Sequence, residues 1–152
     1  MNDLDFVIAL HRTETHALGF IPKPTIRDRF IAPGNYVLIR DRHGHRRGYL
    51  IHAPPRPGLP CRIHQACVEA DYRLRGFAAA AVATIARRAT VADATELLLH
   101  CATDLPAIAF WQSIGFAFRT WNVGGRTRQR VLAELFLPLQ TAAIPARAFA
   151  TW

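Results

Sequence analysis

The segment Arg73–Ala78, R-L-R-G-F-A, combines residue types that suit an anion-binding loop. A tight turn that opens a helix directs several backbone N–H groups at one point, where the helix also carries partial positive charge. Gly76 has no Cβ, so a phosphate can approach the backbone, and Arg73 and Arg75 add positive charge. An arginine-rich turn before a helix also occurs without a ligand. The segment is neither a Walker loop nor a dinucleotide fingerprint, because the required glycines and lysine are missing.

The stretch before this loop, C-R-I-H-Q-A-C-V at 61–68, offers a candidate proton acceptor. Alternation along a strand places Arg62, His64 and Ala66 on one face. His64 titrates near neutral pH and is our candidate for accepting a proton from an ammonium group, directly or through water. A partly buried histidine that only hydrogen-bonds across the sheet is the competing interpretation. Glu69 and His100 are further candidates on the same grounds.

The elements that position these residues follow from periodicity and punctuation. Helices are expected at 11–20, which Gly19 closes, and at 23–31, 76–89 and 106–115. The loop 54–60 holds four prolines and cannot be regular structure. Strands are expected at 3–10, 35–42, 47–53, 61–68, 95–102, 116–123 and 130–139. This order predicts an α/β domain with a mixed, mostly antiparallel sheet and helices on both faces.

The chain has 152 residues, 51% of them hydrophobic and 20% charged, which is typical of one packed domain. We expect that domain at 1–140 and a short tail at 141–152. No stretch approaches the ~20 apolar residues of a membrane span. The start carries acids where a signal peptide carries Lys or Arg, so we expect a cytoplasmic protein without membrane contact. Three cysteines without CxxC spacing predict free core thiols and no metal site.

The net charge of +8 favours acidic partners such as a phosphorylated cofactor or a nucleic acid. Lys23 is the single lysine among 19 basic residues, which leaves 18 arginines. The arginine fork suits bidentate phosphate contact. Genomic base composition together with a solvated surface is the alternative explanation, because the arginines are scattered along the chain.

Two motifs in register resemble the GNAT (GCN5-related) N-acetyltransferase family, which includes phage-encoded members. Arg-x-x-Gly-x-Ala at 73–78 resembles the family's pyrophosphate motif. D-L-P-A-I-A-F-W-Q-S-I-G-F at 104–116 resembles its Asn-x-x-Ala-Ile-x-Leu-Tyr-x-x-x-Gly-Phe segment, with Ala107, Ile108, Gly115 and Phe116 in place. The resemblance covers about residues 35–139 and is strongest over 61–118.

The resemblance implies a V-shaped cofactor cleft between the fourth and fifth predicted strands, 61–68 and 95–102. Pantetheine would insert there as a pseudo-strand, and one strand N–H could polarise the thioester carbonyl. The residues implied to bind acetyl-CoA, or another acyl-CoA, are Ala66, Cys67, Val68, Arg73, Leu74, Arg75, Gly76, Phe77, Ala78, Asp104, Phe110 and Trp111.

The sequence departs from the family pattern at two positions. Asp104 stands where the family often has Asn, and Trp111 stands where it often has a Tyr that is proposed to protonate the leaving thiolate. An indole N–H is not a usable acid, so we interpret Phe110 and Trp111 as core and cofactor-wall residues. Tyr36, Tyr49 and Tyr72 are alternative acids, and the sequence does not choose among them.

The implied function is transfer of an acetyl or other acyl group from acyl-CoA to the primary amine of a small molecule or peptide, by direct attack. A family enzyme that modifies a DNA base or an aminoacyl-RNA, and a CoA-binding module without catalysis, are the alternatives. Members of the family often pair through their last strands, so a homodimer is a further expectation.

Overall fold

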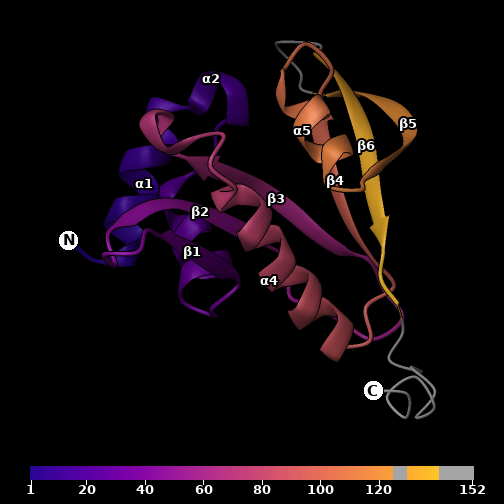
Figure 1. Cartoon of the computed structure of the whole chain (residues 1–152), viewed down its shortest axis with the longest axis horizontal. Helices are drawn as coiled ribbons and strands as arrows, with labels where there is room; N and C mark the ends of the chain where they lie inside the picture. The colour runs from indigo at the N-terminus through magenta and orange to yellow at the C-terminus, as the bar shows by residue number, and fades with distance from the viewer. Residues whose placement is uncertain (125–129, 141–152) are drawn as a thin grey trace.

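The computed structural model describes residues 1–124 and 130–140, and its core is a six-stranded mixed sheet. The strand order is β1-β2-β3-β4-β6-β5 (Figure 1). Among the described strands, only β3 and β4 pair in parallel. The strands are β1 Tyr36–Arg40, β2 Arg46–His52, β3 Cys61–Val68, β4 Glu96–Ala102, β5 Ala117–Gly124 and β6 Arg130–Pro138. The predicted α/β class is confirmed; the predicted tail 141–152 lies outside the described residues.

Helices cover both faces of this sheet, as predicted. α4 Phe77–Val91 and α5 Ala107–Ser113 pack on one face, here called the front, through one hydrophobic cluster. α1 Asp3–Thr13 and the π-helical turn η1 Ile26–Ile31 pack on the rear face through a second cluster. The short elements are α2 Thr15–Leu18, α3 Lys23–Thr25 and the 3-10 turn η2 Ala70–Tyr72.

The predicted strand at 3–10 is wrong, because these residues form α1. The side chain of Asn2 caps the helix by accepting the N–H of Asp5 at 2.8 Å. Acidic residues in the first turn, Asp3 and Asp5, also stabilise the helix by their attraction to the positive end of its dipole. The run Phe6, Val7 and Ile8 has strand-like propensity, but all three side chains are buried on the rear cluster together with His11. Tertiary burial therefore outweighs propensity here.

The parallel pair β3–β4 requires a crossover, and α4 supplies it (Figure 1). The alanine-rich sequence has high helix propensity, and Ala81, Val82, Ile85 and Ala89 form its buried face. The predicted strand 61–68 matches the bounds of β3.

The sheet splits between β3 and β4. The two strands pair only at Cys61↔Leu97 and Arg62↔Leu98. Beyond this apex β3 continues with β2 and β4 continues with β6, so the two arms diverge (Figure 1). The predicted V-shaped gap therefore exists, but it separates the third and fourth strands, because the expected first strand is a helix.

A β-bulge on β3 changes which residues share a face. Ile51 pairs with Gln65 and His52 pairs with Ile63, so His64 is an extra residue without a partner on β2. Before the bulge Arg62 and His64 face the rear; after it Ala66 joins the front cluster. The prediction that Arg62, His64 and Ala66 share one face is therefore wrong for Ala66.

Packing of α4 on the sheet predicts a large cost for truncating its centre. Ile85 is fully buried, so Ile85→Ala should lower the free energy of unfolding by about 2–5 kcal/mol in a denaturant titration. Val91→Ala on the same helix is the control: Val91 is 84% exposed, and the change should stay within about 0.5 kcal/mol. Equal effects of the two substitutions would contradict this packing.

Candidate active site

The gap between β3 and β4 is lined by strand backbone without a strand partner. The N–H of Glu69 donates to the carbonyl of Arg47 on β2 at 2.8 Å. Backbone groups alternate in direction along an extended strand, so those of Val68 and Ala66 point away from β2 and into the gap. The backbone of Cys67 is directed to β2 instead, opposite Tyr49. Of the three predicted backbone contacts, Ala66 and Val68 therefore face the gap.

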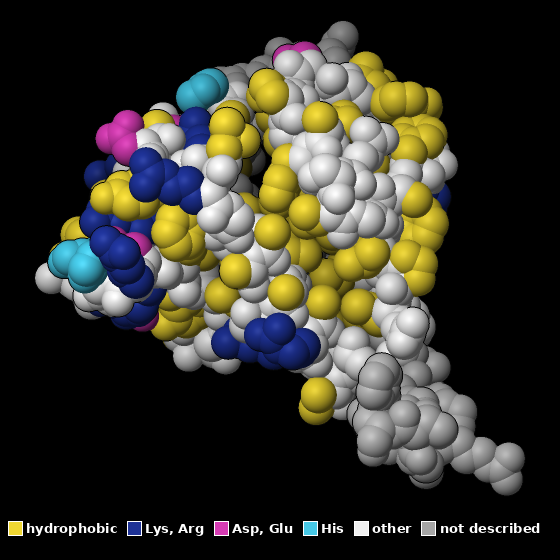
Figure 2. Space-filling view, in the orientation of Figure 1, with side chains coloured by type: hydrophobic (Ala, Val, Ile, Leu, Met, Phe, Trp, Pro, Cys, Tyr) yellow, Lys and Arg dark blue, Asp and Glu magenta, His cyan; other side chains and the backbone are white. Residues whose placement is uncertain are grey.

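Hydrophobic side chains line the hollow between the two halves of the molecule (Figure 2). Trp111 is buried and meets Phe110 and Phe116 edge-on, with ring centroids 5.0 and 5.3 Å apart. Phe110 is only partly buried and packs against the same cluster. Trp111 is thus a core residue, and Phe110 is the more accessible of the pair.

The loop before α4 has the backbone of an anion site. Leu74 and Gly76 both adopt positive φ, 60° and 81°. No side chain among the described residues caps α4, and Ala80 is the donor to the carbonyl of Gly76. The N–H groups of Phe77 and Ala78 therefore precede the helical hydrogen bonds. A Cβ built at Gly76 would meet no atom within 4 Å, so space is open in front of this N-terminus.

The two arginines of the loop differ in how they are held. The Nε of Arg73 donates to the carbonyl of Val68 at 2.9 Å, and its guanidinium pairs with Glu14 at 2.8 Å. Arg73 is therefore held by two contacts to the protein, although its side chain is 46% exposed. The guanidinium of Arg75 lies over the ring of Tyr72, 5.2 Å from its centroid. Arg75 is exposed at the loop surface.

The segment Glu14–Gly19, here called the strap, contacts both arms of the gap. Besides the Glu14 ion pair, Gln65 of β3 donates to the carbonyls of Leu18 and Gly19 at 3.2 and 3.3 Å. From the other arm, Arg130 of β6 donates to the carbonyl of His16 at 3.0 Å. Its second nitrogen pairs with Asp104 at 2.9 Å. The gap is thus closed by strand pairing at its apex and by the strap at its wide end.

His64 is held against the rear layer. Its ring lies 5.0 Å from that of Phe30. Burial first, and then the charges of Arg62 and Arg29, lower the pKa of His64 to about 4. The imidazole is therefore neutral at pH 7 but a weak base.

A second histidine stands on the other arm, where the rear faces of β4 and β6 meet. His100 pairs with Glu134 in the strand register, and its Nε2 lies 3.4 Å from the carboxylate. Burial and the charge of Arg62 lower the pKa of His100, whereas Glu134 raises it. The buried Nδ1 has no partner among the described residues. Glu134 was missed in the sequence, because only the β4–β6 register brings it to His100.

Two of the alternative tyrosine acids are engaged elsewhere. Tyr49 is fully buried, and burial raises its pKa far above the usual range. The hydroxyl of Tyr36 donates to Asp3 at 2.9 Å, at the N-terminal end of α1. Tyr72, directly before the loop 73–78, is the one left near the gap.

The cysteines are free and buried, as predicted, and burial raises their pKa values to about 11, 12 and 11 for Cys61, Cys67 and Cys101. In the part of the chain that the structure describes, no three His, Cys, Asp or Glu side chains gather to hold a metal ion.

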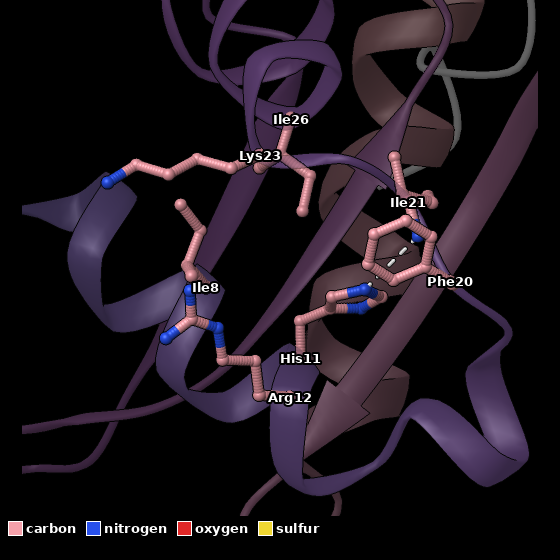
Figure 3. Close-up of a pocket in the computed structure, with 7 residues that line it drawn as sticks. All are labelled: Ile8, His11, Arg12, Phe20, Ile21, Lys23 and Ile26. Atoms are coloured by element: carbon pink, nitrogen blue, oxygen red, sulfur yellow. Dashed lines mark hydrogen bonds between the residues drawn. The ribbon is translucent and has the colours of Figure 1, made fainter.

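A pocket of about 140 Å³ lies apart from this chemistry (Figure 3). Ile8 and Ile26 are among its apolar walls, with Arg12 and Lys23 also in its lining. His11 accepts the N–H of Ile21 at 3.2 Å there. No residue of β3, β4 or the loop 73–78 lines it.

The profile of the Acetyltransferase (GNAT) family matches residues 5–116. The chain belongs to the GNAT family. Among curated protein sequences none matches it. Solved structures share the fold at low identity. Ard1 from Thermoplasma volcanium is 14% identical, covering 91% of this chain and 95% of its own, with a TM-score of 0.76.

Two further GNAT structures show the same fold. The ribosomal-protein-S18-alanine N-acetyltransferase from Escherichia coli is 18% identical over 95% of this chain and 94% of its own, with a TM-score of 0.69. The phosphinothricin acetyltransferase from Sinorhizobium meliloti, in complex with AcCoA, is 19% identical over 90% and 83%, with a TM-score of 0.73. The present GNAT chain is accordingly an acyl-CoA-dependent acetyltransferase.

Several arginines of this GNAT domain form internal ion pairs. Arginines that pair with carboxylates include Arg46 with Asp3, Arg47 with Asp41 and Glu69, Arg73 with Glu14, Arg119 with Glu96, and Arg130 with Asp104. No helix within the described ranges is long and apolar enough to cross a membrane. The net charge of +8 already counts these carboxylates, so a nucleic-acid partner stays a prediction.

Arg130 should be needed to hold the strap of this GNAT domain. Arg130→Ala removes the bond to the carbonyl of His16, worth about 1 kcal/mol, so amide exchange over 14–18 should become about fivefold faster. Exchange measured by mass spectrometry checks this. Arg119→Ala, which breaks the Glu96 pair, is the control and should leave the strap unchanged. Unchanged exchange in Arg130→Ala would show that the strap is held without it.

Proposed function

We propose that this protein transfers an acetyl group from acetyl-CoA to a primary amine by direct attack, without a covalent enzyme intermediate. The observation that carries the proposal is the gap whose free strand backbone, at Ala66 and Val68, leads to the uncapped N-terminus of α4. An extended arm ending in a pyrophosphate has the shape and charge for these two features.

The residues present fit such a donor. The N–H groups of Phe77 and Ala78 and the open space at Gly76 would receive the pyrophosphate, with Arg75 at the surface. The backbone of Ala66 and the N–H of Val68 would pair with the pantetheine arm, while the carbonyl of Val68 accepts from Arg73. An N–H in the gap would polarise the thioester carbonyl. When bound, acetyl-CoA supplies the activated acyl group.

Proton removal from the attacking amine falls to His100 in this proposal. His100 lies on the rear face of β4, two residues after Leu98, where the pairing of β3 with β4 ends. It stands opposite Glu134 of β6. The carboxylate favours the imidazolium that forms when the ring accepts a proton. His64, the candidate from sequence, has a pKa of about 4 and no carboxylate partner among the described residues, which makes it the weaker base.

The absence of a tyrosine at 111 is compatible with this chemistry. A thiol has an ordinary pKa of roughly 8.5, so its thiolate leaves without obligatory protonation. The indole of Trp111 is buried and serves packing. No general acid is therefore assigned.

Calorimetry with acetyl-CoA tests the proposal through a matched pair of substitutions. Gly76→Asn and Gly76→Asp place side chains of nearly equal shape at the same positive φ, which both residues tolerate better than most. Wild type should bind in the micromolar range, about −8 kcal/mol. The Gly76→Asp protein should bind acetyl-CoA at least about tenfold more weakly than the Gly76→Asn protein, because only the aspartate carries a charge that repels the pyrophosphate.

The controls separate the alternatives. Equal acetyl-CoA binding by the Gly76→Asn and Gly76→Asp proteins would place the pyrophosphate elsewhere. No binding by folded wild type would contradict an acyl-CoA-dependent enzyme. Tight binding without acetyl transfer to any amine would favour a CoA-binding module instead.

The pH dependence of kcat tests the role of His100. Burial lowers the pKa of His100 below 6.5, so the ring is neutral at pH 7 and activity should fall as pH drops through that lowered value. A hydrazide acceptor, whose own amine stays neutral, keeps this limb visible. His100→Gln should abolish the limb and lower kcat by roughly 10²–10⁴-fold.

Two further variants make this test specific. Glu134→Gln should move the limb to lower pH, because the carboxylate raises the pKa of His100. His64→Gln should leave the limb in place; if His64→Gln abolished it and His100→Gln did not, the assignment would be reversed.

A further inference from the structure

Two arginines, Arg29 of η1 and Arg62 of β3, lie on the rear side of the gap near His64 and His100, here called the rear mouth. Neither has a carboxylate partner within the described residues 1–124 and 130–140. Other arginines at the gap differ: Arg73 pairs with Glu14 and Arg130 with Asp104. The rear mouth therefore holds uncompensated positive charge, whereas Arg73 and Arg130 are paired. In the loop, Arg75 also has no carboxylate partner among the described residues, but it lies on the side of the donor.

Packing places Arg29 near His64, and Arg62 near both His64 and His100, the proposed base. The guanidinium of Arg29 lies 5.7 Å from the centroid of the Phe30 ring, and that ring lies 5.0 Å from His64. Arg62 is at the apex itself, paired in register with Leu98, two residues before His100 on the same face of β4. η1 thus brings one arginine, and β3 the other, to the face on which His64 and His100 lie.

The electrostatics of the two histidines agree with this placement. Arg62 acts on the pKa of both His64 and His100, and Arg29 acts on that of His64, each lowering it. Like charge so close to a proton acceptor works against catalysis unless an anion neutralises it. A bound anionic group would remove that penalty while it orients the molecule that carries it.

We propose that Arg29 and Arg62 bind an anionic group on the acceptor, so that the acceptor is a small amine that also carries a carboxylate or a phosphate. The arginine fork accepts either oxyanion. The amine of the same molecule then enters the gap from the rear and reaches His100, while the donor occupies the front loop. This inference rests on the proposed acetyl transfer.

Matched acceptors test the proposal. Leucine is compared with leucinamide to test for a carboxylate, and phosphoethanolamine is compared with ethanolamine to test for a phosphate. In Arg62→Gln and Arg29→Gln the KM for the preferred anionic acceptor should rise about tenfold, as expected for loss of one charge-assisted contact. The KM values for its neutral counterpart and for acetyl-CoA should not change. Each acceptor is the same compound in the assays of wild type and of the variants. The ratio of its KM values between these proteins therefore isolates the contribution of the anionic group.

Arg27→Gln is the control, since Arg27 lies on the same π-helical turn but pairs with Asp28 at 2.6 Å. It should leave both KM values unchanged. The acceptor pair whose anionic member shows the rise in KM identifies the oxyanion as carboxylate or phosphate.

The outcomes separate failure of this inference from failure of acetyl transfer. Acetylation of the neutral amines with equal or better efficiency, and equal KM changes for both members of a pair, would overturn the anionic acceptor and leave acetyl transfer intact. If acetyl-CoA binds but none of these amines is acetylated, transfer to small amines is itself contradicted, and the inference with it.

Discussion

The structure depends on how briefly β3 and β4 pair. Two register positions join them, and each arm then follows its other neighbour, β2 or β6. Strand twist separates arms that are not tied together. The divergence leaves the backbone of Ala66 and the N–H of Val68 without a strand partner, whereas the carbonyl of Val68 accepts from Arg73. Backbone groups require a hydrogen-bond partner when they are removed from water. An extended ligand arm satisfies them, which is why the split sheet is a binding site.

The crossover that joins the two arms also assigns a role to each face. α4 must return from the end of β3 to the start of β4, so its N-terminus, with the loop 73–78, stands at the wide end of the gap on the front. The titratable residues lie on the rear, where the bulge at His64 and the β4–β6 register direct them. Donor and acceptor can therefore approach the gap from opposite faces.

Local signals in the sequence were sufficient to predict the elements that glycine, proline or a short apolar run delimits. The strand at 61–68, the turn at Gly76 and the helix between Pro106 and Gly115 were predictable, because glycine, proline and apolar runs act within a few residues. The run Phe6-Val7-Ile8 was not, since burial against a distant sheet decides its conformation. The bulge at His64, the Glu134 partner of His100 and the Arg73–Glu14 pair all depend on contacts between segments far apart in the chain.

Amide hydrogen exchange resolved by NMR at Ala66 and Val68, with and without acetyl-CoA, tests the central claim most directly. If the split sheet holds the donor, these two N–H groups gain protection on binding, while Cys67, already directed to β2, changes little. Protection that appears elsewhere on saturation, with Ala66 and Val68 exchanging as in the free protein, would contradict the account.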